Sequence, residues 1–375
     1  MTTSDKRQNV IIVGGGAAGA SSARELSALL DPAKHRLILI TARPHYTHLP
    51  GTIRMVVSSE EKLEERVFMP YVPDWLHGKG EVKVGRVESI EKSGEKGGRV
   101  VLADGETLDY SVLVLATGST WEGPLNMPDS QEDELAAIKA SRKQFEKANN
   151  IVLVGGGAIG IEFAGEIKDL WPEKEVTIVH NQAILLNGAY PEKWRKTLTK
   201  RVQKGGVQLV LDDQIDDVVP GQDGTVKTRK GKKITADLVV PCRGGRPNTG
   251  FIASSLGADV LSSAGRVKVL PTLQLQNHPR IFAGGDIIEW KEQKQAAKAP
   301  NHAAVIAKNA FALLEKNQLK AKYAGSPEMI AVSFGRNGGA SHLAILWGVT
   351  MGDWLTAKIK SQGLIIDMTK KGLGL

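Results

Sequence analysis

The sequence predicts an α/β fold made of two doubly wound units, each a parallel sheet covered by helices, and a small α+β region at the C-terminus. The apolar run Val10–Val13 leads into the turn GGGAAG and then into an amphipathic stretch. The run Ile151–Val154 leads into GGGAIG in the same way, and an apolar run follows each helix, at 36–40 and 175–179. Strand, glycine turn, helix and strand in this order form parallel sheets.

The first glycine turn has the pattern of a phosphate-binding turn. The residues concerned are Gly14, Gly15, Gly16, Ala17 and Ala18. Glycines allow the backbone to approach a pyrophosphate, and the free N–H groups of the following helix favour an anion. The motif alone is weak, but here it has the strand and helix that it requires on either side. We therefore expect these residues to contact a dinucleotide.

The second turn repeats the first, with Gly155, Gly157 and Gly160 at the fingerprint positions. Both units are therefore predicted to be Rossmann-like. One chain that holds two dinucleotides is suited to electron transfer between them.

The strand ends depart from the usual fingerprint, which places an acid about 20 residues after the glycines. In the first unit Thr41 and Arg43 occupy this region. Thr41 offers one hydroxyl contact, and Arg43 would stack on adenine or pair with a phosphate. In the second unit the strand ends at His180, which is either a site residue or simply a strand-end residue. Without an acid to repel a 2′-phosphate, we expect NADH or NADPH to bind with weak discrimination.

Two further strand ends are predicted to border the nucleotides. The segment 116–118, which contains Thr117 and Gly118, and the segment 244–249 consist mainly of small residues that let the backbone approach a cofactor. Asp286 follows an apolar strand and two glycines, and is placed to accept hydrogen bonds from a ribityl chain. A helix entered near Pro300 would direct its positive end toward a flavin ring.

Two charged residues have alternative interpretations. Glu162, just inside the second helix, either reaches the nicotinamide region or caps the helix. Lys294 either adds positive charge beside a flavin or is a solvated lysine.

The motifs GGGAAG, LVLATGS, GGGAIGIE, CRGGRPNT and AGGD occur here in the order found in FAD/NAD(P)H-dependent pyridine nucleotide oxidoreductases. The sequence resembles this glutathione-reductase-like family over about residues 8–315. The segment Phe334–Gly339 and the basic end resemble the AIF-like, mitochondrion-associated inducer-of-death group, which includes the ferroptosis suppressor proteins. The resemblance implies FAD and NADH or NADPH as cofactors, and electron transfer from NAD(P)H through FAD to a quinone such as ubiquinone.

The resemblance also implies a domain plan and site residues. Residues 1–125 and 244–320 would form the two parts of an FAD-binding domain, and residues 126–243 would form the NAD(P)H-binding domain. Residues 321–375 would form an interface or membrane-contact region. By matched positions, FAD would contact the first glycine turn, Arg54, Val87 and Asp286. Lys360 would lie near the flavin and the acceptor, which makes Glu162, Lys294 and Lys360 the catalytic candidates.

Two other functions fit the same motifs. One is an NAD(P)H-dependent reductase of a small redox protein such as a ferredoxin. The other is an AIF-like signalling or nucleic-acid-binding flavoprotein with weak turnover. The formal net charge of +8 permits nonspecific contact with nucleic acid, which would be sensitive to salt. It also fits a solvated basic surface, or attraction to anionic lipid.

The cysteine and histidine content excludes other chemistries. Cys242 is the single cysteine, so neither an intrachain disulfide nor a cysteine-pair redox centre is available. Glutathione-reductase-like and thioredoxin-reductase-like chemistry are therefore excluded. The eight histidines are scattered, so we expect no metal site. A monomer and a homodimer both remain open.

The sequence predicts peripheral rather than transmembrane contact. No apolar run approaches the roughly 20 residues that span a bilayer, and Thr2 is incompatible with glycine myristoylation. The tail 354–375 mixes apolar residues with Lys358, Lys370 and Lys371. It suits either an interfacial segment or a helix that completes the fold. We expect a cytoplasmic protein that contacts a lipid droplet, the outer mitochondrial surface or the plasma membrane.

Local signals complete the expected plan. Residues 41–80, with several prolines and aromatics, are expected to be irregular. Asp104-Gly105 and Asp223-Gly224 are expected to form hairpin turns. A helix is expected over 298–315 and a strand over 329–334.

Overall fold

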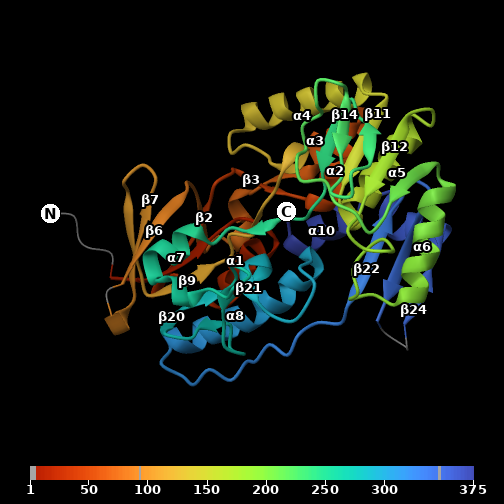
Figure 1. Ribbon diagram of the computed structural model, residues 1–375. Coiled ribbons are helices and arrows are strands. Elements are labelled where there is room, and N and C mark those ends of the chain that lie inside the picture. The colour runs from red at the N-terminus through yellow and green to blue at the C-terminus, as the bar shows by residue number, and fades with distance from the viewer. Residues whose placement is uncertain (1–5, 93, 345–347) are drawn as a thin grey trace.

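A computed structural model describes residues 6–92, 94–344 and 348–375, and it confirms the predicted α/β architecture (Figure 1). Thr2, on which the expectation about myristoylation depends, lies outside these ranges.

The first glycine turn belongs to a sheet of six strands within the described residues. Their order is β19 (Gln274–Leu275), β20 (His278–Ala283), β9 (Val112–Leu115), β1 (Gln8–Val13), β2 (His35–Thr41) and β5 (Gly80–Val84). Strand β1 pairs in parallel with β2 on one side and with β9 on the other. The strand order therefore reverses at β1, and ligands bind at the carboxyl end of a strand at such a point.

The second glycine turn follows the same plan in a sheet of four described strands, which are β13 (Val207–Val210), β12 (Glu175–Val179), β11 (Asn150–Val154) and β16 (Leu238–Pro241). Strand β11 pairs in parallel with β12 and β16, so the order reverses at β11. Both glycine turns therefore begin at the reversal points of their sheets.

Helices cover both sheets. Short strands in the connecting segments pair with one another and form further small sheets. The helices are α1 (Ala17–Leu29), α2 (Leu49–Val57), α3 (Glu64–Val67), α4 (Gln131–Lys147), α5 (Ala158–Leu170), α6 (Glu192–Lys204), α7 (Gly250–Leu256) and α8 (Ala299–Leu314). The small sheets comprise β3 (His45–Thr47) with β4 (Phe68–Pro70), β6 (Val87–Lys92) with β7 (Gly98–Leu102) and β8 (Thr107–Tyr110), β10 (Ser119–Thr120) with β17 (Arg246–Pro247), β14 (Thr225–Lys227) with β15 (Lys233–Thr235), and β18 (Val267–Lys268) with β21 (Ile288–Glu289). Helix α1 packs against α8, and α2 packs against α4 and α5.

Two local predictions were wrong. Residues 41–80 are not wholly irregular, because α2 forms with Pro50 in its first turn, where a missing N–H costs nothing. Asp223-Gly224 forms a turn that precedes β14, since the amide of Gly224 donates to Gly221; the hairpin closes instead at 228–232. The hairpin at Asp104-Gly105, between β7 and β8, was correct.

The C-terminal region packs onto both units. It comprises β22 (Met329–Ser333), β23 (Gly339–Leu343), β24 (Val349–Met351), α9 (Asp353–Thr356), a π-helix (Ala357–Ser361) and α10 (Ile366–Leu373). Leu364, Ile366 and Leu373 are buried, and the indole N–H of Trp75 donates to the carbonyl of Leu373 at 2.7 Å. Figure 1 shows the C-terminus near the middle of the molecule. No helix in the described ranges is long and apolar enough to cross a bilayer.

A buried guanidinium joins three parts of the chain. Arg54 of α2 is 1% exposed, and its Nε and Nη2 donate to the carboxylate of Glu166 on α5 at 2.8 and 2.9 Å. Nη2 also donates to the carbonyl of Ser361 at 2.6 Å. One side chain of the first unit thus holds the second unit and the C-terminal segment together.

Replacing Arg54 with Met leaves the Glu166 carboxylate buried without its partner. We expect the free energy of unfolding to fall by about 3–5 kcal/mol in urea denaturation, because an unpaired buried charge is costly. The double variant Arg54→Met/Glu166→Leu is expected to recover most of that loss.

Arg336 provides the matched control, because its pairs with Glu60 and Glu61 are exposed. Arg336→Met should cost about 1 kcal/mol or less. Equal losses for Arg54→Met and Arg336→Met would contradict a special role for the buried pair.

Candidate active site

Both glycine turns open onto one cavity of about 2130 Å³. Nearly every predicted site residue lines it: Gly14, Gly15, Gly16, Ala17, Ala18, Thr41, Arg43, Val87, Thr117, Gly118, Gly155, Gly157, Glu162, His180, Asp286, Lys294 and Lys360. Arg54 and Gly160 do not line it. The cavity receives walls from both sheets and from the C-terminal region, so two dinucleotides held at the turns would share one space.

The first turn is shaped for close contact with a ligand. Gly14 has φ +110°, and a Cβ there would lie 2.3 Å from the carbonyl oxygen of Ala116, so only glycine fits. At Gly16 a Cβ would meet no protein atom within 4 Å, so the backbone is bare on the side where a ligand approaches. Gly16 is also the N-cap of α1, whose first N–H groups suit a pyrophosphate.

The second turn repeats this geometry. Gly155 has φ +128°, and a Cβ there would lie 2.4 Å from the carbonyl oxygen of Cys242. Gly157 is open in the same way as Gly16. A Cβ at Gly160 would lie 2.0 Å from the carbonyl oxygen of Gly155, so Gly160 serves the contact of helix with strand rather than the ligand. The residues at both turns fit dinucleotides.

Arg43, which follows β2 of the first unit, forms its hydrogen bonds and ion pair within the protein. The Arg43 Nε donates to the carbonyl of Pro128 at 2.8 Å and lies 3.1 Å from the buried carboxylate of Glu134. The hydroxyl of Thr41 donates to the carbonyl of Arg43 at 3.1 Å. The guanidinium is therefore held by the protein, although Arg43 still lines the cavity.

His180 braces the second glycine turn. Its Nδ1 accepts from the backbone N–H of Gly156 at 3.2 Å, so Nε2 carries the proton that is donated to the carbonyl of Leu186 at 3.1 Å. Burial lowers the pKa of His180, which favours this neutral form. The imidazole therefore presents no positive charge to a nucleotide phosphate.

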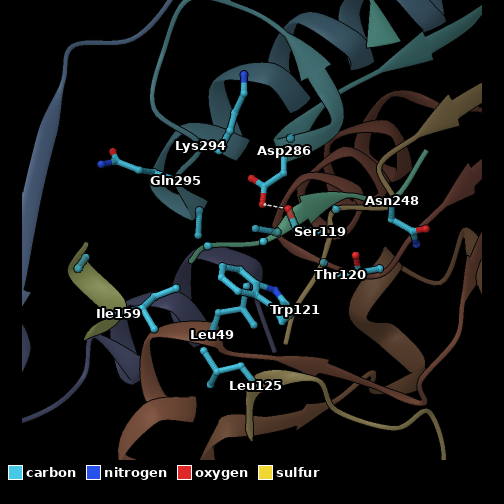
Figure 2. A pocket seen from close by; sticks show the side chains of 18 of the residues that line it. Leu49, Ser119, Thr120, Trp121, Leu125, Ile159, Asn248, Asp286, Lys294 and Gln295 are labelled. Atoms are coloured by element: carbon cyan, nitrogen blue, oxygen red, sulfur yellow. Dashed lines mark hydrogen bonds between the residues drawn. The ribbon is translucent and has the colours of Figure 1, made fainter. Parts of the chain in front are cut away.

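Asp286 and Lys294 lie on one side of the cavity (Figure 2). The hydroxyl of Ser119 donates to the Asp286 carboxylate at 2.8 Å, which fixes the side chain. Burial lowers the pKa of Lys294, whose ammonium donates to the carbonyl of Trp290 at 3.3 Å. Behind the Asp286 turn, His302 accepts from the N–H of Gly285 at 3.0 Å, a brace that sequence reasoning missed.

Glu162 and Lys360 meet in the cavity, although they are far apart in the sequence. The Lys360 ammonium donates to the carboxylate of Glu162 and, at 2.8 Å, to the carbonyl of Ala331. The N–H of Ser333 donates to Glu162 at 3.1 Å. The structure thus places a paired acid and ammonium where the second unit meets the C-terminal region.

Sequence reasoning also missed apolar and aromatic residues of the cavity. Leu49, Trp121, Leu125 and Ile159 all line it (Figure 2). Tyr71 supports the first turn, since its hydroxyl donates to the carbonyl of Gly15 at 2.5 Å. These residues lie in irregular connections or at helix starts, where a single sequence carries no periodic signal.

A family model for pyridine nucleotide-disulphide oxidoreductases matches residues 8–305. The chain belongs to this family. It is 45% identical over 321 residues to FAD-dependent oxidoreductase FVFD30 of Flammulina velutipes, which covers 85% of this chain and 99% of the relative. It is 31% identical over 378 residues to ferroptosis suppressor protein 1 of Taeniopygia guttata, which covers 99% and 97%.

Among solved structures, the sulfide:quinone oxidoreductase of Aquifex aeolicus matches with a TM-score of 0.79 over 97% of this chain and 92% of that chain, at 16% identity, which shows a shared fold. The predicted family and fold are therefore confirmed. The family assignment and the shape of the two turns agree with FAD and NADH or NADPH as the cofactors. Within the described residues, no group of three histidine, cysteine or acidic side chains is arranged to hold a metal.

Gly16 and Gly157 allow the two nucleotide sites to be tested separately. A Cβ at either position would meet no protein atom within 4 Å, so we expect the fold to tolerate Val there. We expect Gly16→Val to purify without flavin absorbance. Gly157→Val should keep flavin absorbance and weaken NAD(P)H binding by about tenfold or more, measured by calorimetry.

Circular dichroism of both variants checks that they fold. Full FAD content in Gly16→Val would contradict the FAD assignment of the first turn. Unchanged NAD(P)H affinity in Gly157→Val would contradict the assignment of the second.

Proposed function

We propose that the protein is an FAD-dependent NAD(P)H:quinone oxidoreductase. The observation that carries the quinone assignment is a group of apolar side chains that line the cavity and that we call its apolar mouth: Leu49, Ile359, Ile365 and Met368. The exposed fractions of Leu49, Ile359 and Met368 are 45%, 42% and 68%. Apolar residues left uncovered at a concave site suit an apolar ligand. A lipid-soluble quinone has that chemistry, whereas a polar acceptor gains little from such a wall.

The mouth lies where α2 meets the C-terminal segment. The Nε2 of His48, beside Leu49, is 2.7 Å from the carbonyl of Leu364, beside Ile365. Leu364 and Ile365 both have positive φ, at 51° and 52°. A β-branched residue in this conformation is strained, and such strain persists where the surroundings enforce it, commonly at ligand sites.

The proposed overall reaction is NAD(P)H + H⁺ + quinone → NAD(P)⁺ + quinol. FAD, when bound, would carry the two electrons between the nicotinamide and the quinone. The chain's own contribution is to position both rings and to supply charge and protons. The Lys360 ammonium, held by Glu162, is suited to stabilise a quinone oxygen as negative charge develops and to hold a proton for it.

An anaerobic assay tests this function. NADH or NADPH should bleach the visible flavin absorbance of the purified protein, and a water-soluble ubiquinone analogue should restore it. Lys360→Met should lower kcat with the quinone by about 100-fold, the scale of losing one acid–base group. Glu162→Gln should lower it less, because the lysine remains.

Lys308→Met is the matched control, because Lys308 is exposed on α8 and does not line the cavity. Recovery of flavin absorbance with ferredoxin but not with the quinone would favour the reductase of a small redox protein. Negligible turnover of NAD(P)H with every acceptor would favour the signalling alternative.

We also propose that the outer face of the C-terminal segment contacts anionic lipid. Trp354 and Leu355 are 70% and 39% exposed, and the Lys358 ammonium lies 4.3 Å from the centre of the Trp354 ring. Lys370 and Lys371 are exposed on α10. Apolar residues with lysines beside them suit a membrane interface. Since Ile359 and Met368 are exposed here and also line the cavity, a quinone would enter directly from the bilayer.

Vesicle co-sedimentation tests this contact. Binding to vesicles that contain phosphatidylserine is expected, with a loss at high salt and a further loss in Lys370→Glu/Lys371→Glu. Met368→Ser should weaken binding, whereas Val219→Ser should not, since Val219 is equally exposed at 68% but lies in the second unit. Equal binding by Met368→Ser and wild type would contradict this orientation.

A further inference from the structure

Trp121 is the one aromatic side chain labelled among the cavity residues of Figure 2, and neither the glycine turns nor the acid–lysine pair explains it. The indole projects into the cavity that Leu49, Leu125 and Ile159 also line. The residue is partly exposed, although tryptophan is usually covered when it packs in a core. A large planar apolar surface is therefore presented to whatever occupies the cavity.

The position of Trp121 is fixed from both nucleotide-binding sites. It directly follows β10, whose residues Ser119 and Thr120 pair with Pro247 and Arg246 of β17. Ser119 also donates to Asp286. The segment that carries the indole is thus tied to the predicted ribityl-binding acid and to the segment that follows β16 of the second sheet.

The segment that follows β16, the last strand of the second sheet, lies against the indole. A Cβ at Gly245 would lie 3.1 Å from the Cε2 atom of Trp121 and 2.6 Å from the Cβ of Ser119, so the absence of a side chain at Gly245 makes room for the ring. Gly245 belongs to the segment after β16, the strand that pairs with β11 and its glycine turn. The ring therefore stands beside the second dinucleotide site.

The N–H of this indole has no hydrogen-bond acceptor among the described residues. Trp75 donates its N–H to the carbonyl of Leu373, but within the described residues no acceptor is recorded for the N–H of Trp121. An indole placed at a ligand site can both stack through its ring and donate through its N–H. Ala158, the first residue of α5, also lines the cavity and is too small to cover a bound ring.

We infer that Trp121 is a positioning residue that packs against the nicotinamide half of the dinucleotide bound at the second glycine turn. This inference rests on one part of the proposed function, namely that NAD(P)H binds at the second glycine turn. The contact with Gly245 favours the nicotinamide over the quinone, because Gly245 follows β16, which pairs with β11 and its glycine turn. Stacking would hold the nicotinamide ring in a single orientation for hydride transfer.

Oxidised dinucleotides separate this role from simple support of the fold. The FAD-loaded protein and its Trp121→Ala variant are titrated calorimetrically with NAD⁺, NADP⁺ and ADP-ribose. ADP-ribose has the adenosine and both phosphates but no nicotinamide. We expect Trp121→Ala to weaken the tighter of NAD⁺ and NADP⁺ by about tenfold, the scale of one aromatic contact, and to leave ADP-ribose unchanged.

Trp121→Phe should retain most of the affinity, since it keeps a stacking ring, and Trp171→Phe serves as the control outside the cavity. In turnover, Trp121→Ala should raise KM for the dinucleotide and lower kcat, while KM for the quinone analogue stays unchanged.

Equal weakening of all three ligands, or a change confined to the quinone KM, would overturn the inference. A wild-type protein that binds none of the three ligands would instead overturn the proposed function.

Discussion

Helix α5 carries the constraint on which the site depends. Two carboxylates one turn apart face different parts of the chain: Glu166 binds Arg54 of the first unit, and Glu162 binds Lys360 of the C-terminal region. Arg54 also reaches the carbonyl of Ser361, next to Lys360. The helix that opens with the second glycine turn therefore also fixes the edge of the first unit and the segment at the cavity mouth. Burying a charge costs free energy unless the charge is paired. The two carboxylates of α5 therefore favour the fold in which the first unit and the C-terminal region both lie against this helix.

The parts of the fold that depend on local signals were predictable. Each glycine turn follows an apolar strand and opens a helix, so the motif and its context lie within a few residues of one another. The turn residues other than Gly160, together with Asp286, line the cavity. Helix α2 was not predictable in the same way, because it has no side-chain cap and begins among prolines and aromatics. Its stability comes from packing against α4 and α5, which a single sequence does not display.

The roles of the charged residues were less predictable than their positions. The resemblance implies that Arg54 contacts FAD, whereas in the structure its guanidinium donates to Glu166 and to the carbonyls of Ser361 and Gln362. Arg43 and His180 line the cavity, but their nitrogens bind protein backbone: Arg43 donates to the carbonyl of Pro128, and His180 accepts from the N–H of Gly156. A sequence shows which residues can ionise, whereas tertiary partners decide which of them keep a free hydrogen bond for a ligand. The same reasoning explains why Trp121, whose N–H has no recorded partner among the described residues, carried no sequence signal.

The C-terminal segment unites features that the sequence presents separately. It supplies Lys360 to the acid pair, Ile359 and Met368 to the apolar mouth, and Trp354 to the exposed outer face. The two interpretations of this tail, an interfacial segment and a helix that completes the fold, are therefore compatible. Buried Leu364, Ile366 and Leu373 fix the segment to the protein, which leaves the neighbouring apolar side chains uncovered. If the segment were held only by packing of its apolar side chains, no apolar side chain would remain exposed for a ligand or a lipid. Because ion pairs and backbone hydrogen bonds hold much of it, its remaining apolar side chains stay available at the mouth of the site.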